Sequence, residues 1–194
     1  MQQKIVLASQ SPRRQQLLKQ IGYSNFEIRK SDYPEESIKE TEPARLVELL
    51  ALNKARAVLP FYAEKPALII GGDTVVFAKN KIFGKPRTKK EAAEMLRTIS
   101  GNAVYGYSGV AVVDSLSGKE VVTHGWGKMI FRRLREKEIE RYIQEEKDVL
   151  NFAGGFGLLN RGAMLIEGIE GDFFSIVGLP LTKLHLILQG LIKG

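Results

Sequence analysis

The sequence contains no cysteine and only two histidines among its 194 residues. The absence of cysteine excludes disulfide bonds, thiolate catalysis and cysteine-ligated zinc, and it is compatible with a reducing cytoplasm. His124 and His185 lie far apart in the sequence, and we interpret both as structural. No apolar run approaches the length of a membrane span, and no long apolar segment follows Met1. We therefore expect a cytoplasmic protein that does not use a membrane.

The two common nucleotide-binding loops are also missing. Gly84-Lys85 has no glycine five residues before it, so the sequence has no P-loop. Gly155-x-Gly157 is not followed by a third glycine at the dinucleotide-binding spacing. Any nucleotide would have to bind by other means.

Charge is the first positive indication of a ligand. The chain carries 29 basic and 22 acidic residues, a net charge of +7, which favours nucleic acid, an acidic membrane or a nucleotide as partner. Nucleic acid ranks last, because no recognition motif or aromatic stacking pattern accompanies the charge. With 44% hydrophobic residues the chain can bury a sizeable core, and we expect a single domain over residues 1–194.

Strand and helix patterns alternate along the chain and predict an α/β fold. Two turns, at Lys79-Asn80 and at 115–118, predict hairpins and hence a mixed sheet. Trp126 and Phe131 are expected in the core. The expected strands cover residues 4–8, 26–30, 67–71, 74–77, 104–113, 120–131 and 173–177. The expected helices cover residues 12–21, 43–59, 89–99, 136–146 and 181–191.

The segment Ser9-Gln10-Ser11-Pro12-Arg13-Arg14 joins the first strand to the first helix and is the best candidate for an anion site. Ser11 suits the N-cap position and Pro12 the first helical position, while Gly22 provides a stop. A helix start presents unpaired backbone N–H groups, and Arg13 and Arg14 add positive charge where the helix dipole disfavours it. A phosphate-bearing ligand explains this pattern, although two solvated surface arginines are the alternative.

A carboxylate and a lysine interrupt apolar patterns further along the chain. Asp73 follows two glycines between two apolar runs, where a carboxylate is costly unless it is paired or binds a cation. A turn aspartate bonded to its own backbone is the alternative. Lys54 lies at the edge of the apolar stripe of its helix, so it either pairs with a carboxylate or reaches along the helix to solvent.

Two further segments could contribute to a polyphosphate site. Lys85 lies in Gly84-Lys85-Pro86, where proline restricts the backbone, which suits phosphate binding as well as an ordinary basic loop. Glu36, in an acidic run before the second helix, could hold a divalent cation together with Asp73. A solvated acidic loop is the alternative for that run.

Together these segments resemble the Maf family of nucleoside triphosphate pyrophosphatases. The resemblance spans nearly the whole chain in the order of the family's motifs, and their combination is specific although each motif is weak. The matching segments are Ser9 to Arg14, Asn53-Lys54-Ala55, Gly72-Asp73-Thr74, Gly84-Lys85-Pro86, Ser100-Gly101 and Val177-Gly178-Leu179-Pro180.

The resemblance implies an elongated, two-lobed, mixed-sheet α/β fold of the Maf/Ham1-like (inosine triphosphatase-like) type with a central cleft. Many such proteins form homodimers. It implies hydrolysis of a nucleoside triphosphate to the monophosphate and pyrophosphate with magnesium or manganese, a house-cleaning role in nucleotide metabolism.

The resemblance also implies a role for each matching residue. Asp73 would accept the proton of the attacking water, with Lys54 and Lys85 as catalytic cations, and Glu36 would join Asp73 at the metal. The implied substrate-binding residues are Ser9, Ser11, Arg13, Arg14, Thr74 and Leu159.

Three positions bear on the preferred base. Arg13 and Thr74 resemble the residues that the branch acting on dTTP and UTP carries at these two positions. Leu159 stands where that branch has glutamine and the 7-methyl-GTP branch has glutamate, and leucine can neither donate nor accept a hydrogen bond. Hydrolysis of 7-methyl-GTP or another modified nucleotide is therefore an alternative, as is a catalytically weak, nucleotide-binding regulator of cell division.

Overall fold

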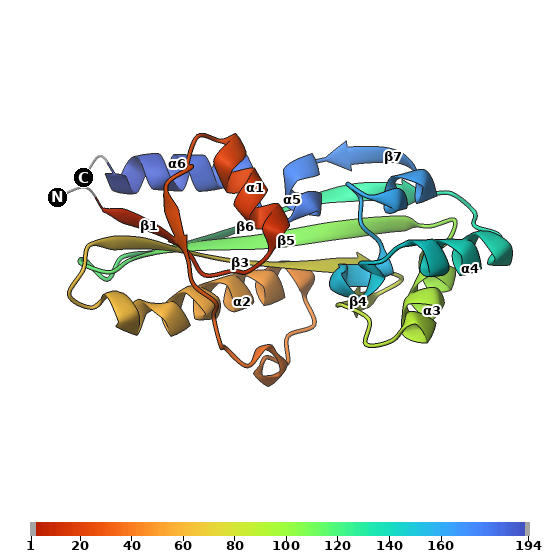
Figure 1. The fold of residues 1–194 in the computed structure, drawn as a ribbon, viewed down its shortest axis with the longest axis horizontal. Coiled ribbons are helices and arrows are strands. Elements are labelled where there is room, and N and C mark those ends of the chain that lie inside the picture. Colours follow the sequence, from red (N-terminus) through yellow and green to blue (C-terminus); the bar gives the residue numbers. More distant parts are fainter. Residues whose placement is uncertain (1–2, 193–194) are drawn as a thin grey trace. The chain divides into compact units, whose positions relative to one another are not determined.

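The computed structural model describes residues 3–192, which divide into two compact units that share three strands (Figure 1). Unit 1 comprises residues 3–74, 108–125 and 178–192, and unit 2 comprises residues 75–107 and 126–177. The strands β3 (Ala67–Ala78), β5 (Ala103–Asp114) and β6 (Glu120–Phe131) contribute to both. Within residues 3–192, no helix has both the length and the apolar character that a membrane crossing requires.

The strands form one mixed sheet in the order β2-β1-β3-β5-β6-β7, with β4 paired to β3. The pairs β1–β2 and β1–β3 are parallel, while β3–β4 and β6–β7 are antiparallel. The predicted α/β class with a mixed sheet is thus confirmed. The remaining strands are β1 (Lys4–Leu7), β2 (Phe26–Ile28), β4 (Lys81–Phe83) and β7 (Ile166–Gly171).

Unit 1 packs helices on both faces of its part of the sheet (Figure 1). Its helices are α1 (Pro12–Gln20), α2 (Pro43–Val58) and α6 (Leu181–Ile192), with short 3₁₀ turns η1 (Glu35–Ser37) and η2 (Leu59–Tyr62). Parallel strands covered on both faces are expected to be apolar throughout, and β1 is buried except at its first residue.

Two glycines set the distance between α2 and the sheet. A Cβ at Gly71 would lie 2.0 Å from the carbonyl oxygen of Ala51, and a Cβ at Gly109 would lie 2.0 Å from that of Val47. The helix backbone therefore lies directly against β3 and β5, which only glycine permits. The sequence predicted two strands, at residues 67–71 and 74–77, but β3 is continuous through Gly71 and Gly72. Gly71 serves the close approach of α2 and does not end the strand.

Unit 2 has its own buried cluster, which includes Val76, Leu96, Met129, Phe131 and Tyr142. Its β3–β4 hairpin turns through Lys79 and Asn80, both at positive φ (47° and 58°), as the sequence predicted. Its other elements are α3 (Lys89–Ile99), α4 (Glu136–Glu145), α5 (Phe173–Val177) and the 3₁₀ turns η3 (Val149–Asn151), η4 (Ala153–Gly155) and η5 (Arg161–Leu165).

Two predictions about unit 2 are wrong. Residues 173–177 form α5 and not a strand, because the Asp172 carboxylate accepts hydrogen bonds from the Phe174 N–H (3.0 Å) and the Ser175 hydroxyl, which caps a helix. Trp126 is 48% exposed and does not belong to the core, since it lies on the opposite face of β6 from its buried neighbours Gly125 and Gly127.

Candidate active site

The first polar cluster of unit 1 forms where β1 leads into α1. Ser11 occupies the N-cap position and Pro12 follows it, as predicted, but the Ser11 side chain makes no capping hydrogen bond. Instead, the Ser11 backbone N–H donates to Ser9 Oγ at 3.2 Å. The first turn of α1 contains no acidic residue, so the positive end of the helix dipole is not neutralised by the helix itself.

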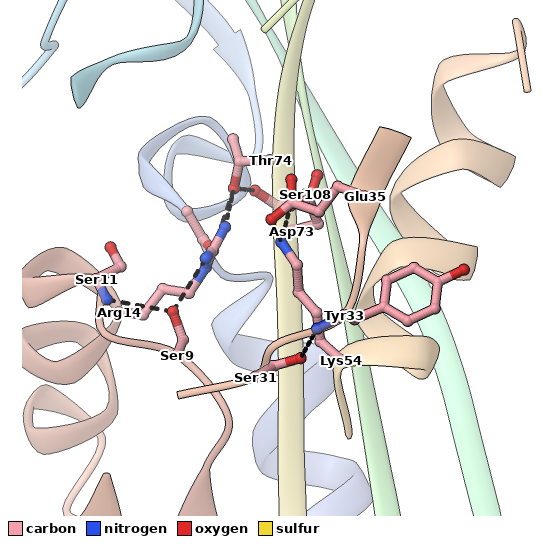
Figure 2. Close-up of polar contacts among 11 residues, drawn as sticks. Ser9, Ser11, Arg14, Ser31, Tyr33, Glu35, Lys54, Asp73, Thr74 and Ser108 are labelled. Carbon is pink, nitrogen blue, oxygen red and sulfur yellow. Dashed lines mark hydrogen bonds and ion pairs between the residues drawn. The ribbon is translucent and has the colours of Figure 1, made fainter. Parts of the chain in front are cut away.

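Arg14 extends from this helix start toward Thr74 of β3, and all three nitrogens of its guanidinium donate hydrogen bonds within unit 1 (Figure 2). Its Nε donates to the carbonyl of Gly178 (3.1 Å), its Nη1 to Ser9 Oγ (3.2 Å) and its Nη2 to Thr74 Oγ1 (3.0 Å). Thr74 Oγ1 in turn lies 2.8 Å from Ser108 Oγ. The guanidinium therefore fixes two of the predicted substrate-binding hydroxyl groups.

Burial lowers the pKa of Arg14, while the carboxylates of Asp73 and Glu35 act in the opposite direction. Burial also lowers the pKa of Arg13, and the neighbouring charge of Arg14 adds to this effect. Two guanidiniums thus lie close together in a poorly solvated place. Such a place favours an anion.

The second polar cluster links α2, β3 and η1 through one ammonium group. Lys54 Nζ lies 2.6 Å from Asp73 Oδ1 and 2.7 Å from Glu35 Oε1 (Figure 2). The Lys54 and Asp73 side chains are only 12% and 10% exposed, whereas that of Glu35 is 56% exposed. Of the two alternatives for Lys54, the paired one is correct.

Local structure explains how these groups meet. The apolar stripe of α2 faces the sheet, and Lys54 at its edge points along β3 because Gly71 keeps the helix close. Asp73 follows on the same face of β3, two residues after Gly71. The loop that carries Glu35 is tied to α2 by a hydrogen bond from Asn53 Nδ2 to the Tyr33 hydroxyl (3.3 Å).

Most of the predicted site residues are brought together in unit 1. Arg14 contacts Ser9 and Thr74, Ser11 contacts Ser9, and Lys54 contacts Asp73. Arg13 is half-buried in the first turn of the same helix.

The other three predicted residues are exposed. Glu36 lies in η1, and its predicted role at a metal remains a prediction. Lys85 and Leu159 belong to unit 2, and their roles also remain predictions.

Three polar groups of the site were not identified from the sequence as site residues. Glu35 belongs to the same acidic run as Glu36, which was the residue predicted from the sequence. The run indicated a candidate site, but it did not show which of the two glutamates contributes to it. Ser108 is fully buried, and its only signal was its place in a polar Tyr-Ser-Gly segment. Gly178 lies in one of the segments that resemble the Maf family, but the sequence does not show that its carbonyl accepts from Arg14, since backbone acceptors depend on the path of the chain.

Comparison with known proteins places this chain in a family. The family model described as Maf-like protein matches residues 4–191. A dTTP/UTP pyrophosphatase of Moorella thermoacetica is 43% identical over 185 residues, which cover 95% of this chain and 93% of the relative. Proteins of the same name are 42% identical in Pelotomaculum thermopropionicum (95% of each chain) and 40% identical in Methanococcoides burtonii (96% of this chain, 94% of the relative).

Among solved structures, a nucleoside-triphosphatase / dITP/XTP pyrophosphatase of Mycobacterium abscessus matches 96% of this chain and 94% of its own, at 20% identity and a TM-score of 0.47. The family model covers nearly the whole chain, and the full-length relatives agree with it. This chain therefore belongs to the Maf family.

Proposed function

We propose that this protein is a nucleoside triphosphate pyrophosphatase that hydrolyses dTTP or UTP to the monophosphate and pyrophosphate. The observation that carries the proposal is the buried Lys54–Asp73 pair in unit 1, which holds a carboxylate away from bulk water. The full-length relatives that bear the name dTTP/UTP pyrophosphatase support the substrate.

Asp73 is the proposed base. Its Oδ1 accepts a hydrogen bond from Lys54 Nζ at 2.6 Å, and in the proposed reaction its Oδ2 accepts the hydrogen bond of the attacking water molecule. The water oxygen attacks the α-phosphorus while its proton passes to Asp73. The bond from the α-phosphorus to the bridging oxygen breaks, and pyrophosphate leaves with that oxygen.

The cationic groups have different proposed roles. Arg14 acts as a positioning residue, because Nε, Nη1 and Nη2 of its guanidinium already donate hydrogen bonds to the Gly178 carbonyl, Ser9 and Thr74. Arg13 and the helix start bind the phosphates, and Lys54 balances the charge that develops during the reaction. Lys85 is proposed as a further phosphate ligand from the family resemblance.

The proposal includes a divalent cation held by carboxylates of unit 1. Among the described residues no group of three or more His, Cys, Asp or Glu side chains could hold a metal. Magnesium, however, is commonly bound by one or two carboxylates together with substrate phosphates, and Asp73 with Glu36 or Glu35 can supply these. When bound, magnesium or manganese would neutralise phosphate charge and orient the substrate.

Two neighbouring glutamates allow the cation ligand to be identified. In Glu35→Gln and Glu36→Gln we expect different effects, because Glu35 contacts Lys54 and Glu36 is the residue assigned to the metal by resemblance. The magnesium concentration for half-maximal activity should rise in Glu36→Gln and stay near the wild-type value in Glu35→Gln. The reverse result would assign the cation to Glu35.

The substrate is tested with a panel of dTTP, UTP, CTP, GTP, ATP and 7-methyl-GTP, with pyrophosphate and monophosphate measured as products. Preferential cleavage of dTTP and UTP supports the proposal. Preferential cleavage of 7-methyl-GTP would contradict the proposed base preference, and binding without turnover of any nucleotide would contradict the proposed activity.

A further inference from the structure

Four aromatic side chains of unit 2 form a connected row across three strands. Phe77 of β3 meets Tyr107 of β5 edge-on (centroids 6.5 Å apart, planes at 88°), and Tyr107 lies nearly parallel to Trp126 of β6 (6.4 Å, 29°). Tyr105 of β5 contacts the same Trp126 ring (6.1 Å, 54°). We call these four residues the aromatic row.

The row lies on the face of the strands opposite the core of unit 2. Val104 of β5 and Met129 of β6 are both fully buried in that core. Because side chains alternate along a strand, Tyr105, Tyr107 and Trp126 face the other way. None of the four rings belongs to the buried cluster of unit 2.

The row is partly exposed to solvent, most of all at Trp126. Trp126 is 48% exposed, and the other three rings are half-buried. Aromatic side chains contribute most when they are buried, and a contiguous exposed group of them marks a binding surface more often than a scattered exposed residue does.

The backbone behind Trp126 is firmly held. A Cβ at Gly127 would lie 2.7 Å from Ile176 Cδ1 and 2.8 Å from the Asp172 carbonyl oxygen, so glycine lets α5 pack directly against β6. The Asp172 N–H also donates to the Trp126 carbonyl at 3.2 Å. A ring on a rigid strand loses little freedom when a flat ligand stacks on it.

We propose that the aromatic row is a stacking surface for the nucleobase of a free nucleotide. Every nucleobase presents a flat π-face, and exposed aromatic side chains on a sheet bind such faces without needing a particular hydrogen-bond pattern. The inference rests on the proposed function for the source of the base, since a nucleoside triphosphate supplies one. It assigns a chemical class of ligand to residues that have no part in the polar site of unit 1.

The single tryptophan of the chain makes a direct measurement possible, because Trp126 is part of the row. Uridine, thymidine and adenosine are titrated into the wild-type protein while tryptophan emission is recorded, with ribose 5-phosphate as the probe that lacks a base. Nucleosides carry no phosphate, so binding at the row is separated from phosphate binding and from turnover. We expect saturable quenching by the nucleosides and none by ribose 5-phosphate.

A matched pair of variants tests the assignment to the row. Tyr107→Leu, which removes the ring nearly parallel to Trp126, should weaken nucleoside binding roughly tenfold. Phe173→Leu removes an aromatic ring of unit 2 that lies outside the row and is 38% exposed, and it should leave the nucleoside Kd unchanged.

Several results would overturn the inference. These are the absence of saturable quenching, equal quenching by ribose 5-phosphate, binding of an oligonucleotide but not of nucleosides, or an emission change that follows protein concentration because a second copy covers the row. Failure of the proposed function is distinguishable, since it would leave nucleoside quenching intact while no pyrophosphate is released. Pyrophosphate release without nucleoside quenching would instead reject only the stacking surface.

Discussion

Replacement of Lys54 by methionine tests the arrangement of the site through stability. Methionine keeps much of the length of the side chain but removes the ammonium that lies 2.6 Å from Asp73 and 2.7 Å from Glu35. Asp73, with 10% of its side chain exposed, would then keep a charge without its partner, and breaking a buried pair in this way costs about 3–5 kcal/mol. Glu35 is 56% exposed and remains solvated, so it adds little.

The same geometry predicts an asymmetry between the two partners. In Asp73→Asn the Lys54 ammonium keeps its ion pair with Glu35 and can still donate to the amide oxygen at position 73. We therefore expect the free energy of unfolding to fall by about 1 kcal/mol. Lys54→Met should lose about 3 kcal/mol, and the double variant should lose less than the sum of the two because no stranded carboxylate is left.

Urea unfolding at pH 7 measures all three losses. Lys128→Met serves as the control, because its exposed ion-pair partner Glu170 at 3.1 Å should contribute less than about 0.5 kcal/mol. A loss of under about 1 kcal/mol in Lys54→Met, or strictly additive losses in the double variant, would refute the reasoning that Asp73 depends on this ammonium.

Two further predictions concern unit 1. Gly71→Ala should lower the free energy of unfolding by about 3 kcal/mol, because its Cβ would lie 2.0 Å from a backbone oxygen of α2, whereas Gly84→Ala has nothing within 4 Å and should be neutral in urea unfolding. Hydrogen bonds from Lys4 and Tyr62 lower the pKa of Glu27, so their stabilisation is present above the unfolded pKa of about 4.3 and disappears as pH falls through the folded pKa. The stability difference between wild type and Glu27→Gln should therefore be present at pH 7 and shrink as the pH falls through the folded pKa; a difference that grows or stays constant as the pH is lowered through the acidic range would contradict this.

Much of the fold could be predicted because the residues that start, end or connect its helices and strands act locally. Gly22 ends α1 at a positive φ of 93°, Thr88 caps α3 by accepting a hydrogen bond from Glu91, and Lys79-Asn80 makes the β3–β4 hairpin. Each of these depends on the conformational preference of one or two residues. The bounds of β6 and α3 were predicted correctly for the same reason.

The errors have different physical causes. Residues 173–177 are rich in strand-forming side chains, but Asp172 caps them as a helix. The strand β7 reads Ile-Glu-Gly-Ile-Glu-Gly, which has weak strand preference, and it forms by pairing with β6. Trp126 was expected in the core, but the residue type does not reveal the face of the strand on which the side chain lies.

The candidate site shows the same limit. The sequence identified Asp73 and Lys54 separately, since each charge interrupts an apolar pattern, and their pairing was one of two alternatives. It did not distinguish Glu35 from Glu36, because the path of the 3₁₀ turn η1 decides which neighbour reaches Lys54. The sequence also could not show that the N–H groups of Arg14 donate to hydroxyl and carbonyl groups within the protein.

The central claim is that Asp73 activates a water molecule for attack on the α-phosphorus. Hydrolysis of dTTP in ¹⁸O-labelled water, followed by mass analysis of both products, tests it most directly, with Asp73→Asn measured alongside. We predict that the label enters the monophosphate and not the pyrophosphate, and that Asp73→Asn loses at least about a hundredfold in rate. Label in the pyrophosphate, or a rate in Asp73→Asn close to that of the wild type, would contradict the account.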